Sequence, residues 1–333
     1  MNDFVKVSVI IPNYNHQRFL EQRINSVLNQ TYKNYEVILL DDASSDGSRA
    51  LFNEYANHAK VSHMIINSEN SGCVFKQWIK GIELAVGKYI WIAESDDFAE
   101  DSFLESTVAV LEKNESFGMV FTDTTKVDEN GQYLGLISKS KKMLSNAINN
   151  EIIINRTNFT KYLLNELAII NASSVLFQKK ALMTVDFETL KLFKNTGDVF
   201  TYLGIVLNYD LIFLPKALNY MRFHSNNSTK SNKRSGQIYK DKILLFDHYL
   251  KDFMKFESNR TDCYNFFVSF LFLSLDHGLD KEIHQVIKQM RTISFIKPSK
   301  YSQIQNILFF YKYMMYKGRP YFLRERLKTI LLS

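Results

Sequence analysis

An alternation of short apolar runs and amphipathic segments over the first 125 residues constrains the fold of this chain most. Residues 5–11, 35–40, 61–66 and 89–93 are apolar runs of strand length. Between them, apolar residues recur at helical spacing, as in Leu20, Ile24, Val27 and Leu28. This alternation is typical of βαβ units. It predicts an α/β fold built on a parallel sheet with helices on its faces.

The length and composition allow more than one domain. The chain has 333 residues, of which 46% are hydrophobic, enough for one large α/β domain and a further region. The polar stretch 225–235 reads as a linker, so we expect one domain over residues 1–232 and a helical, basic and aromatic-rich region over residues 233–333. Two distant cysteines and an N-terminus without a secretory signal predict a cytoplasmic protein.

Positive charge is concentrated at the C-terminal end. Residues 291–333 carry nine Lys or Arg and one Glu, a net +8 in a chain whose total is +6. Since the rest of the chain is slightly acidic, no nucleic-acid-binding face is predicted. Basic and aromatic residues alternate in this tail, which indicates either peripheral contact with an anionic membrane or a helical bundle with lysine stems lying along it. No apolar run reaches the roughly 20 residues of a membrane-spanning helix.

Polar clusters follow the predicted strands. Residues 12–15 come after the first strand, Asp41 and Asp42 after the second, residues 67–72 after the third, and residues 94–97 after the fourth. Ligands of open α/β sheets bind outside the carboxyl ends of the strands, so these clusters should meet in one crevice. Three carboxylates within residues 94–97 repel one another unless a cation is present. Oxygen ligands suit Mg²⁺ or Mn²⁺, so the pattern predicts a metal and diphosphate site.

These motifs, in their order, resemble the family 2 inverting glycosyltransferases. The resembling segments are VSVIIPNYN at 7–15, LNQTY at 28–32, EVILLDDASSDGS at 36–48, NSG at 70–72 and GKYIWIAESDD at 87–97. The resemblance covers roughly residues 5–230 and implies a GT-A fold, a Rossmann-like nucleotide-binding sheet with helices on both faces, followed here by a C-terminal helical extension. An ordered series of motifs is more specific than any one of them.

The resemblance implies roles in donor binding. Asp42 would accept a hydrogen bond from a uracil-type ring N–H, although Asp is also a common turn residue. Tyr14 would offer an aromatic face to the base. Residues 77–81 lack the arginine that many members have there, so a lysine would replace it as a point charge. The implied nucleotide-sugar-binding residues are Pro12, Tyr14, Asn15, Asp42, Asn70, Lys76, Asp96 and Arg222.

The resemblance also implies a metal set and a catalytic base. Asp97, Asp96 and His224 would hold Mn²⁺ or Mg²⁺. An inverting transferase needs a carboxylate that takes the proton from the acceptor hydroxyl, and Asp198 stands in a segment that resembles the family's motif for this base. Asp198 also suits a helix N-cap, and the two roles are compatible.

The implied reaction transfers a sugar from a nucleotide diphosphate sugar, UDP-linked, to a hydroxyl of a saccharide acceptor. Bacterial members suggest an acceptor linked to undecaprenyl diphosphate, in O-antigen, capsule or other surface polysaccharide synthesis at the inner membrane face. The alternative is a catalytically inactive nucleotide-sugar-binding or scaffold protein with the same fold. A nucleotidyltransferase or a dinucleotide oxidoreductase is disfavoured, because the first strand is followed by neither a basic Gly-rich loop nor G-x-G-x-x-G.

Overall fold

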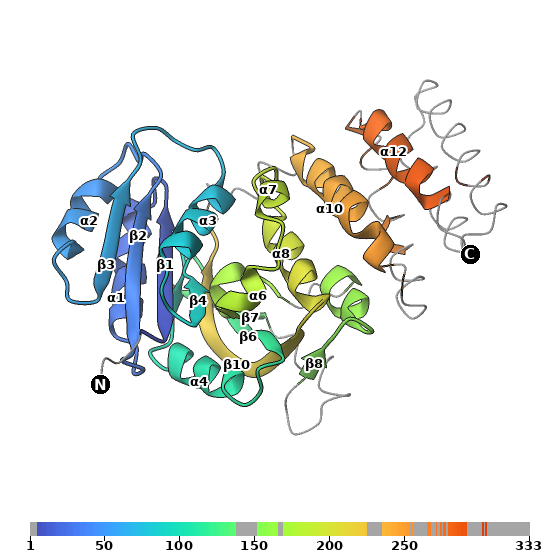
Figure 1. The fold of residues 1–333 in the computed structure, drawn as a ribbon. Coiled ribbons are helices and arrows are strands. Elements are labelled where there is room, and N and C mark those ends of the chain that lie inside the picture. Colours follow the sequence, from blue (N-terminus) through green and yellow to red (C-terminus); the bar gives the residue numbers. More distant parts are fainter. Residues whose placement is uncertain are drawn as a thin grey trace. The chain divides into compact units, whose positions relative to one another are not determined.

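The computed structural model describes residues 5–137, 152–165, 169–224, 235–253 and 279–291, with a few further positions between 255 and 304 (Figure 1). Two compact units emerge from the contacts within the chain. One consists of Met1–Arg156 with Leu167–Asn227, and the other of Thr157–Glu166 with Ser228–Ser333. The domain boundary at residue 232 stays a prediction.

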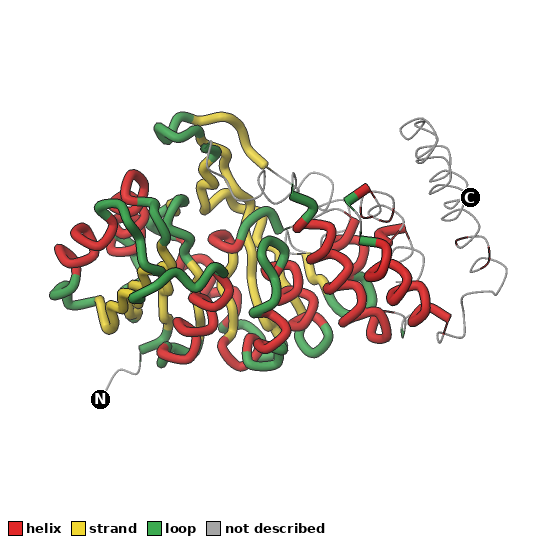
Figure 2. Tube along the Cα trace, turned by 90° about the horizontal axis from the view of Figure 1, so that it is seen from above, coloured by secondary structure: helices red, strands yellow, loops and turns green. Residues whose placement is uncertain are grey.

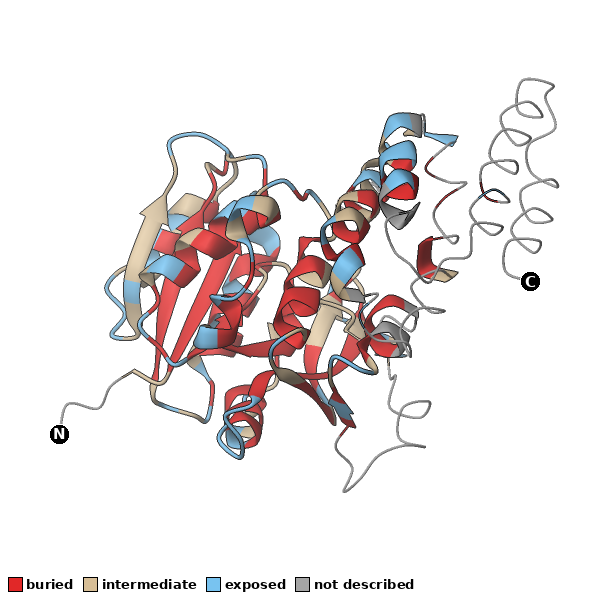
Figure 3. Cartoon of the chain, turned by 45° about the vertical axis from the view of Figure 1, so that its right-hand side comes forward, coloured by how far each residue is buried: buried red, intermediate tan, exposed pale blue. Residues whose placement is uncertain are grey.

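The first half of the sheet is parallel, as the sequence predicts. Its strands are β1 (Val7–Asn13), β2 (Tyr35–Asp41), β3 (Val61–Ile66) and β4 (Tyr89–Ile92), in the order β3-β2-β1-β4. Every residue of β1, β2 and β4 is buried, and these strands form the centre of the core in Figure 3. Strands buried on both faces explain why these segments read as continuous apolar runs.

Helices cover both faces of these strands. They are α1 (Gln17–Leu28), α2 (Ser48–Tyr55), α3 (Val74–Leu84) and α4 (Phe103–Leu111). On one face, Val9 of β1 belongs to a core cluster with Leu20 and Ile24 of α1. On the other face, Ile10 meets α3 at Gly81, where a Cβ would lie 2.4 Å from Ile10 Cγ2. The view from above shows the strands between helices (Figure 2), which confirms the predicted α/β class.

The second half of the sheet is mixed. It contains β5 (Phe98–Ala99), β6 (Phe117–Val127), β9 (Val175–Gln178) and β10 (Asp210–Arg222), in the order β4-β9-β6-β10-β5, with β7 (Tyr133–Ile137) on β6 and β8 (Ile152–Ile154) on β10. Strand β9 is antiparallel to both of its neighbours. Strand β10 is continuous over 13 residues, but its register with β6 shifts between Leu214 and Ala217. Pro215 lies in this gap and has no N–H for the ladder.

The pairing of β5 with β10 places the residues after β10 near the loop of residues 94–97, called the acidic loop below. Phe98 stands opposite Tyr220 in this antiparallel pair, and their rings stack 4.4 Å apart. Because β5 follows directly after residues 94–97, this pairing carries the end of β10 to that acidic loop. The carboxyl ends of β1 and β4 are neighbours in the parallel sheet, so their loops meet at the same edge.

The remaining helices are short in the first unit and longer in the second. They are α6 (Lys179–Leu182), α7 (Phe187–Leu190), α8 (Gly197–Val206), α10 (Gln237–Phe253) and α12 (Asp280–Arg291), with single turns at Thr160–Asn165 and Ala172–Ser174. Gln285 Nε2 of α12 donates to Asp247 Oδ2 of α10 over 3.2 Å. In the described part of the C-terminal region, these two helices agree with the predicted helical extension. Within the described ranges, no helix combines the length and apolarity needed to cross a bilayer.

Candidate active site

The loops after β1 and β2 are fastened to each other by asparagine side chains. Asn13 Nδ2 donates to Asp41 Oδ2 (3.0 Å) and to Ser44 Oγ (3.1 Å). Asn15 donates its backbone N–H to Ser44 Oγ (2.9 Å) and accepts from the backbone N–H of Ser45 (2.8 Å). Asn15 adopts φ 57°, a left-handed conformation that asparagine tolerates better than most residues. The two loops therefore form one preorganised wall.

This wall presents an aromatic ring to solvent. Tyr14 lies between the two anchored asparagines and is 47% exposed, whereas Pro12 is buried within β1. An exposed ring on an anchored loop can stack against a flat base at little entropic cost. The predicted base-binding role of Tyr14 is compatible with this position.

Asp42 is the centre of a buried hydrogen-bond network. Its Oδ1 accepts from Asn67 Nδ2 (2.7 Å), Ser71 N (3.0 Å) and Gln77 Nε2 (2.8 Å), and its Oδ2 accepts from Ser71 Oγ (2.7 Å). Asn70 Nδ2 donates to the Asp42 backbone carbonyl (3.0 Å). The carboxylate thus ties the loop after β3 to the end of β2. A base N–H would join a carboxylate that already has four donors.

The lysines of α3 lie beside this network. Lys76 Nζ donates to the Ser71 carbonyl over 3.1 Å and is exposed, and Lys80 Nζ donates to Asn67 Oδ1 over 2.7 Å. Lys76 is thus the more exposed of the pair, and its phosphate role stays a prediction.

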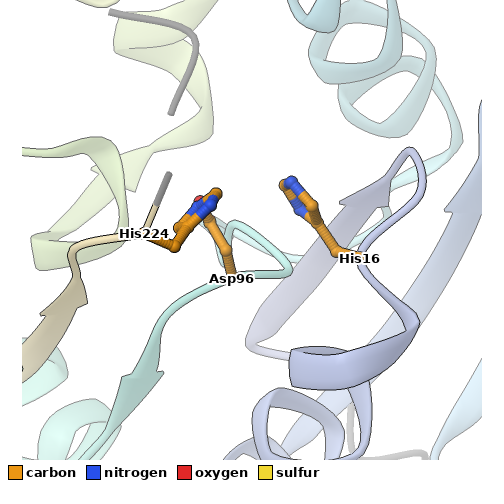
Figure 4. A group of neighbouring side chains, drawn as sticks. All are labelled: His16, Asp96 and His224. Carbon is orange, nitrogen blue, oxygen red and sulfur yellow. The ribbon is translucent and has the colours of Figure 1, made fainter. Parts of the chain in front are cut away.

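A second cluster brings three distant residues together. His16 follows β1, Asp96 follows β4 and His224 follows β10, and Figure 4 shows their side chains converging. His224 Nε2 lies 3.2 Å from Asp96 Oδ2, and His16 Nδ1 lies 2.8 Å from Ser95 Oγ. One potential ligand atom from each of the three lies within 4.8 Å of the others. This donor set is compatible with a divalent cation.

Asp97 occupies a different environment from Asp96. Its carboxylate is buried, and it accepts from Asn171 Nδ2 (2.7 Å) and from the backbone N–H of Arg222 (3.1 Å). It thereby holds the end of β10 against the acidic loop. Burial, and then the charge of Asp96, raise the pKa of Asp97 to about 7. Asp96 and His224 of the predicted metal set lie together, whereas Asp97 faces the protein interior.

Arg222 joins several segments through its guanidinium group. Its Nε donates to the Asp96 carbonyl (3.0 Å), its Nη1 to the carbonyls of Asp128 and Glu129 (3.2 Å each), and its Nη2 to Gln22 Oε1 (2.5 Å). The side chain is 2% exposed. Since all three nitrogens have protein acceptors, Arg222 supports the acidic loop in this structure. A phosphate contact would require it to exchange these partners.

A buried arginine lies on the other side of this loop. Arg23 of α1 is 0% exposed, donates from Nε to the Glu94 carbonyl (2.8 Å), and lies 5.6 Å from the Trp91 ring. Its two terminal nitrogens have no hydrogen-bond partner among the described residues. Burial lowers the pKa of Arg23 to about 10, opposed by the carboxylates of residues 94–97. Glu94 Oε1 accepts from Trp78 Nε1 (2.7 Å), and burial raises the pKa of Glu94 to about 8.

The segment before α8 lies against the loop that holds Asp42. Lys194 Nζ donates to the Gly72 carbonyl (2.7 Å), and Cys73 Sγ donates to the Phe193 carbonyl (3.1 Å). At Gly197 a Cβ would lie only 2.6 Å from the ring of Phe75, so the start of α8 lies close against α3.

Asp198 stands in the first turn of α8, where its Oδ1 accepts from the backbone N–H of Val199 (2.8 Å). It is partly exposed. One turn later, the hydroxyl of Tyr202 is buried, and its pKa is raised by burial and then by the charges of Asp198 and Glu94. The charges of Asp198 and Glu94 thus both act on this hydroxyl, and a crevice shared by Asp198 and the strand-end loops stays a prediction.

Sequence reasoning did not single out three residues of this site. His16 directly follows the loop residue Asn15, and this position next to a predicted binding loop was the sequence feature that could have identified it. Arg23 reads as a polar position on an amphipathic helix, yet it is buried. Asn171 lies in an irregular segment and belongs to no motif, so its contact with Asp97 had no sequence signal.

Comparison with known proteins identifies the family. The model of glycosyl transferase family 2 matches residues 8–183. The putative glycosyltransferase EpsE of Bacillus subtilis is 37% identical over 39% of this chain and 47% of its own length. The putative teichuronic acid biosynthesis glycosyltransferase TuaG of Bacillus subtilis is 31% identical over 44% of this chain and 58% of its own. The chain therefore spans about half the length of these curated relatives.

Solved structures show the same fold. S. aureus TarS 1-349 in complex with UDP-GlcNAc superposes with a TM-score of 0.61 at 18% identity, over 85% of this chain and 79% of that one. This similarity confirms the expected GT-A architecture. Since the family model covers more than half of the sequence and the motifs lie at the strand ends of this fold, the chain belongs to glycosyl transferase family 2.

Proposed function

We propose that this chain transfers a sugar from a nucleoside diphosphate sugar, UDP-linked, to a hydroxyl of a saccharide acceptor, with inversion. The observation that carries the proposal is the meeting of four strand-end loops at one edge of the sheet. The loops after β1, β2 and β3 offer Tyr14 and the Asp42 network for the nucleoside. The loop after β4 and the end of β10 offer Asp96 and His224 for the metal ion. TarS, which shares the fold, has been solved with UDP and with UDP-GlcNAc, which supports a uridine donor.

The residues divide the chemistry between them. Asp96 and His224 would hold Mn²⁺ or Mg²⁺, which supplies Lewis-acid neutralisation of the departing diphosphate when bound. Asp97 would support them through its bonds to Asn171 and to the backbone of Arg222. Asp198, partly exposed at the head of α8, would accept the proton from the acceptor hydroxyl.

The names of the relatives suggest the wider role. TuaG is named for teichuronic acid biosynthesis, which supports a place in bacterial surface polysaccharide synthesis for this chain as well. We propose an acceptor linked to undecaprenyl diphosphate and peripheral contact with the inner face of the membrane through the basic tail of residues 291–333. Apart from Arg291 at the end of α12, the aromatic and basic residues of that tail lie outside the described part of the chain.

A donor screen tests the proposal. Nucleotide sugars are incubated with the protein and Mn²⁺, with water as the acceptor of the sugar, and release of nucleoside diphosphate is measured. We expect one donor class to be consumed, and we expect Asp198→Asn to bind it normally while its rate falls on the order of 100-fold or more. Donor binding without any release, for wild type as for Asp198→Asn, would favour the inactive scaffold instead.

A further inference from the structure

We infer that His16 is a third protein ligand of the metal ion, and that two imidazoles with one carboxylate make this site select Mn²⁺ or Co²⁺ over Mg²⁺. The inference rests on the proposed function only in placing a cation at Asp96 and His224. It adds a ligand from a separate loop, and it names the class of metal.

The spacing of the side chains fits one ion. Ligand atoms of His16, Asp96 and His224 lie within 4.8 Å of one another. Two ligands about 2.1 Å from the same ion and at right angles to each other stand about 3 Å apart. The 3.2 Å between His224 Nε2 and Asp96 Oδ2 is close to this value.

One tautomer of His16 leaves Nε2 for the ion. Its Nδ1 lies 2.8 Å from Ser95 Oγ, so with a proton on Nδ1 the ring donates to Ser95 and Nε2 carries the lone pair. A metal-binding histidine usually donates its other ring nitrogen to such an outer partner, which fixes the tautomer. His16 occupies the N-cap position of α1 but makes no side-chain capping bond, so helix α1 does not use this ring.

An apolar side chain packs beside both imidazoles. Phe19, which is 8% exposed, has its ring centroid 6.2 Å from that of His16 and 5.2 Å from that of His224. The two imidazole rings lie 5.8 Å apart and nearly perpendicular. Packing of this kind limits ring rotation and the access of water, as outer-shell residues do at protein metal sites. The two histidines are therefore positioned before any ion arrives.

The donor atoms decide which ion is preferred. Mg²⁺ favours oxygen ligands and retains its waters, whereas imidazole nitrogen favours first-row transition ions. A site with Asp96 as its only carboxylate ligand, since Asp97 is bonded to Asn171 and Arg222, has few oxygen donors for Mg²⁺. Three protein ligands also suffice to hold the ion without a nucleotide.

The test measures metal binding alone. The purified 333-residue chain without nucleotide is titrated with Mn²⁺. Free Mn²⁺ is followed by electron paramagnetic resonance, with Mg²⁺ and Co²⁺ as competitors. We expect one Mn²⁺ per chain, weak competition by Mg²⁺, and stronger competition by Co²⁺. For His16→Gln the dissociation constant for Mn²⁺ should rise on the order of tenfold or more, since even outer-shell changes have such effects.

Two further variants sharpen the result. His16→Glu replaces nitrogen with oxygen, so the preference for Mn²⁺ over Mg²⁺ should fall several-fold while an ion is still bound. His63→Gln, on the outer strand β3, serves as the matched control and should bind as wild type. Thermal unfolding without metal confirms that each variant is folded.

Mn²⁺ binding by His16→Gln equal to that of wild type would overturn the inference. So would the absence of Mn²⁺ binding to nucleotide-free wild type, or equal affinity for Mg²⁺. These results leave the donor screen unaffected, because a two-ligand site completed by the diphosphate would still support transfer.

Discussion

Replacing Asp97 by Asn should make the stability of the protein less sensitive to pH. The carboxylate is 4% exposed, and burial raises its pKa from the usual 3.8 to about 7. Between these two values the unfolded chain has released the proton while the folded protein still holds it. The contribution of Asp97 to the free energy of unfolding therefore falls as the pH rises from about 4 to about 7. Above about pH 7 this contribution no longer changes with pH.

The size of the effect follows from the pKa difference. Each pKa unit corresponds to about 1.4 kcal/mol, so Asp97 lowers the stability of metal-free protein by up to about 4 kcal/mol across this window. The introduced amide cannot ionise, and it can still be accommodated. Asn171 Nδ2 donates to Asp97, and Asn171 Oδ1 accepts from Asn219 Nδ2, whose own Oδ1 has no partner among the described residues. Reversing both amides supplies an acceptor for the new donor.

The assay is urea unfolding of both proteins, with a chelator, at half-unit steps from pH 4.5 to 8. The stability of Asp97→Asn relative to wild type should increase across this range by a few kcal/mol and then level off. Subtracting the two curves removes the contribution of every other titrating group that the substitution leaves unchanged. Two curves that stay parallel would refute the buried, proton-holding state of Asp97.

Three further single substitutions, one of them repeated together with a second change, and one truncation test other parts of the structure. Glu94→Gln should show the same pH trend up to about pH 8, because burial raises that pKa to about 8, and a constant difference from wild type would contradict this. Gly81→Ala should lower the free energy of unfolding by about 1–3 kcal/mol in thermal unfolding, since its Cβ would lie 2.4 Å from Ile10 Cγ2. Adding Ile10→Ala to this variant should relieve part of that loss. Unchanged stability of Gly81→Ala would show that helix α3 can move away from β1. Asp42→Ala removes the acceptor of four hydrogen bonds, so amide exchange in the loop after β3 should become faster and the affinity for UDP should fall. Amide exchange at the wild-type rate would show that Asp42 does not anchor this loop. Ending the chain at residue 290 should release the protein from anionic vesicles, and unaltered binding would assign that contact elsewhere.

Much of the parallel half of the sheet was predictable from sequence. The strands around Ile10 and Trp91 are buried on both faces and read as apolar runs, and parallel neighbours bring their following loops to one edge. The position of β9 between β4 and β6 was not predictable, because a strand's apolar pattern records burial but not its neighbours.

The side-chain directions within the site were also beyond the sequence. Asp96 and Asp97 are adjacent, yet one faces His224 and the other faces Asn171 and the end of β10. The difference depends on the long-range pairing of β5 with β10, which no local pattern encodes. Arg222 is a similar case, since its acceptors are backbone carbonyls and a glutamine from distant segments.

The most direct test of a single metal-dependent donor site is calorimetric titration with UDP. Wild type should bind UDP in the presence of Mn²⁺, and binding should weaken strongly with a chelator or in Asp96→Asn, whose carboxylate faces His224. UDP binding of equal strength with chelator, with Mn²⁺ and in Asp96→Asn would contradict the proposal that the strand-end loops and the cation form one site.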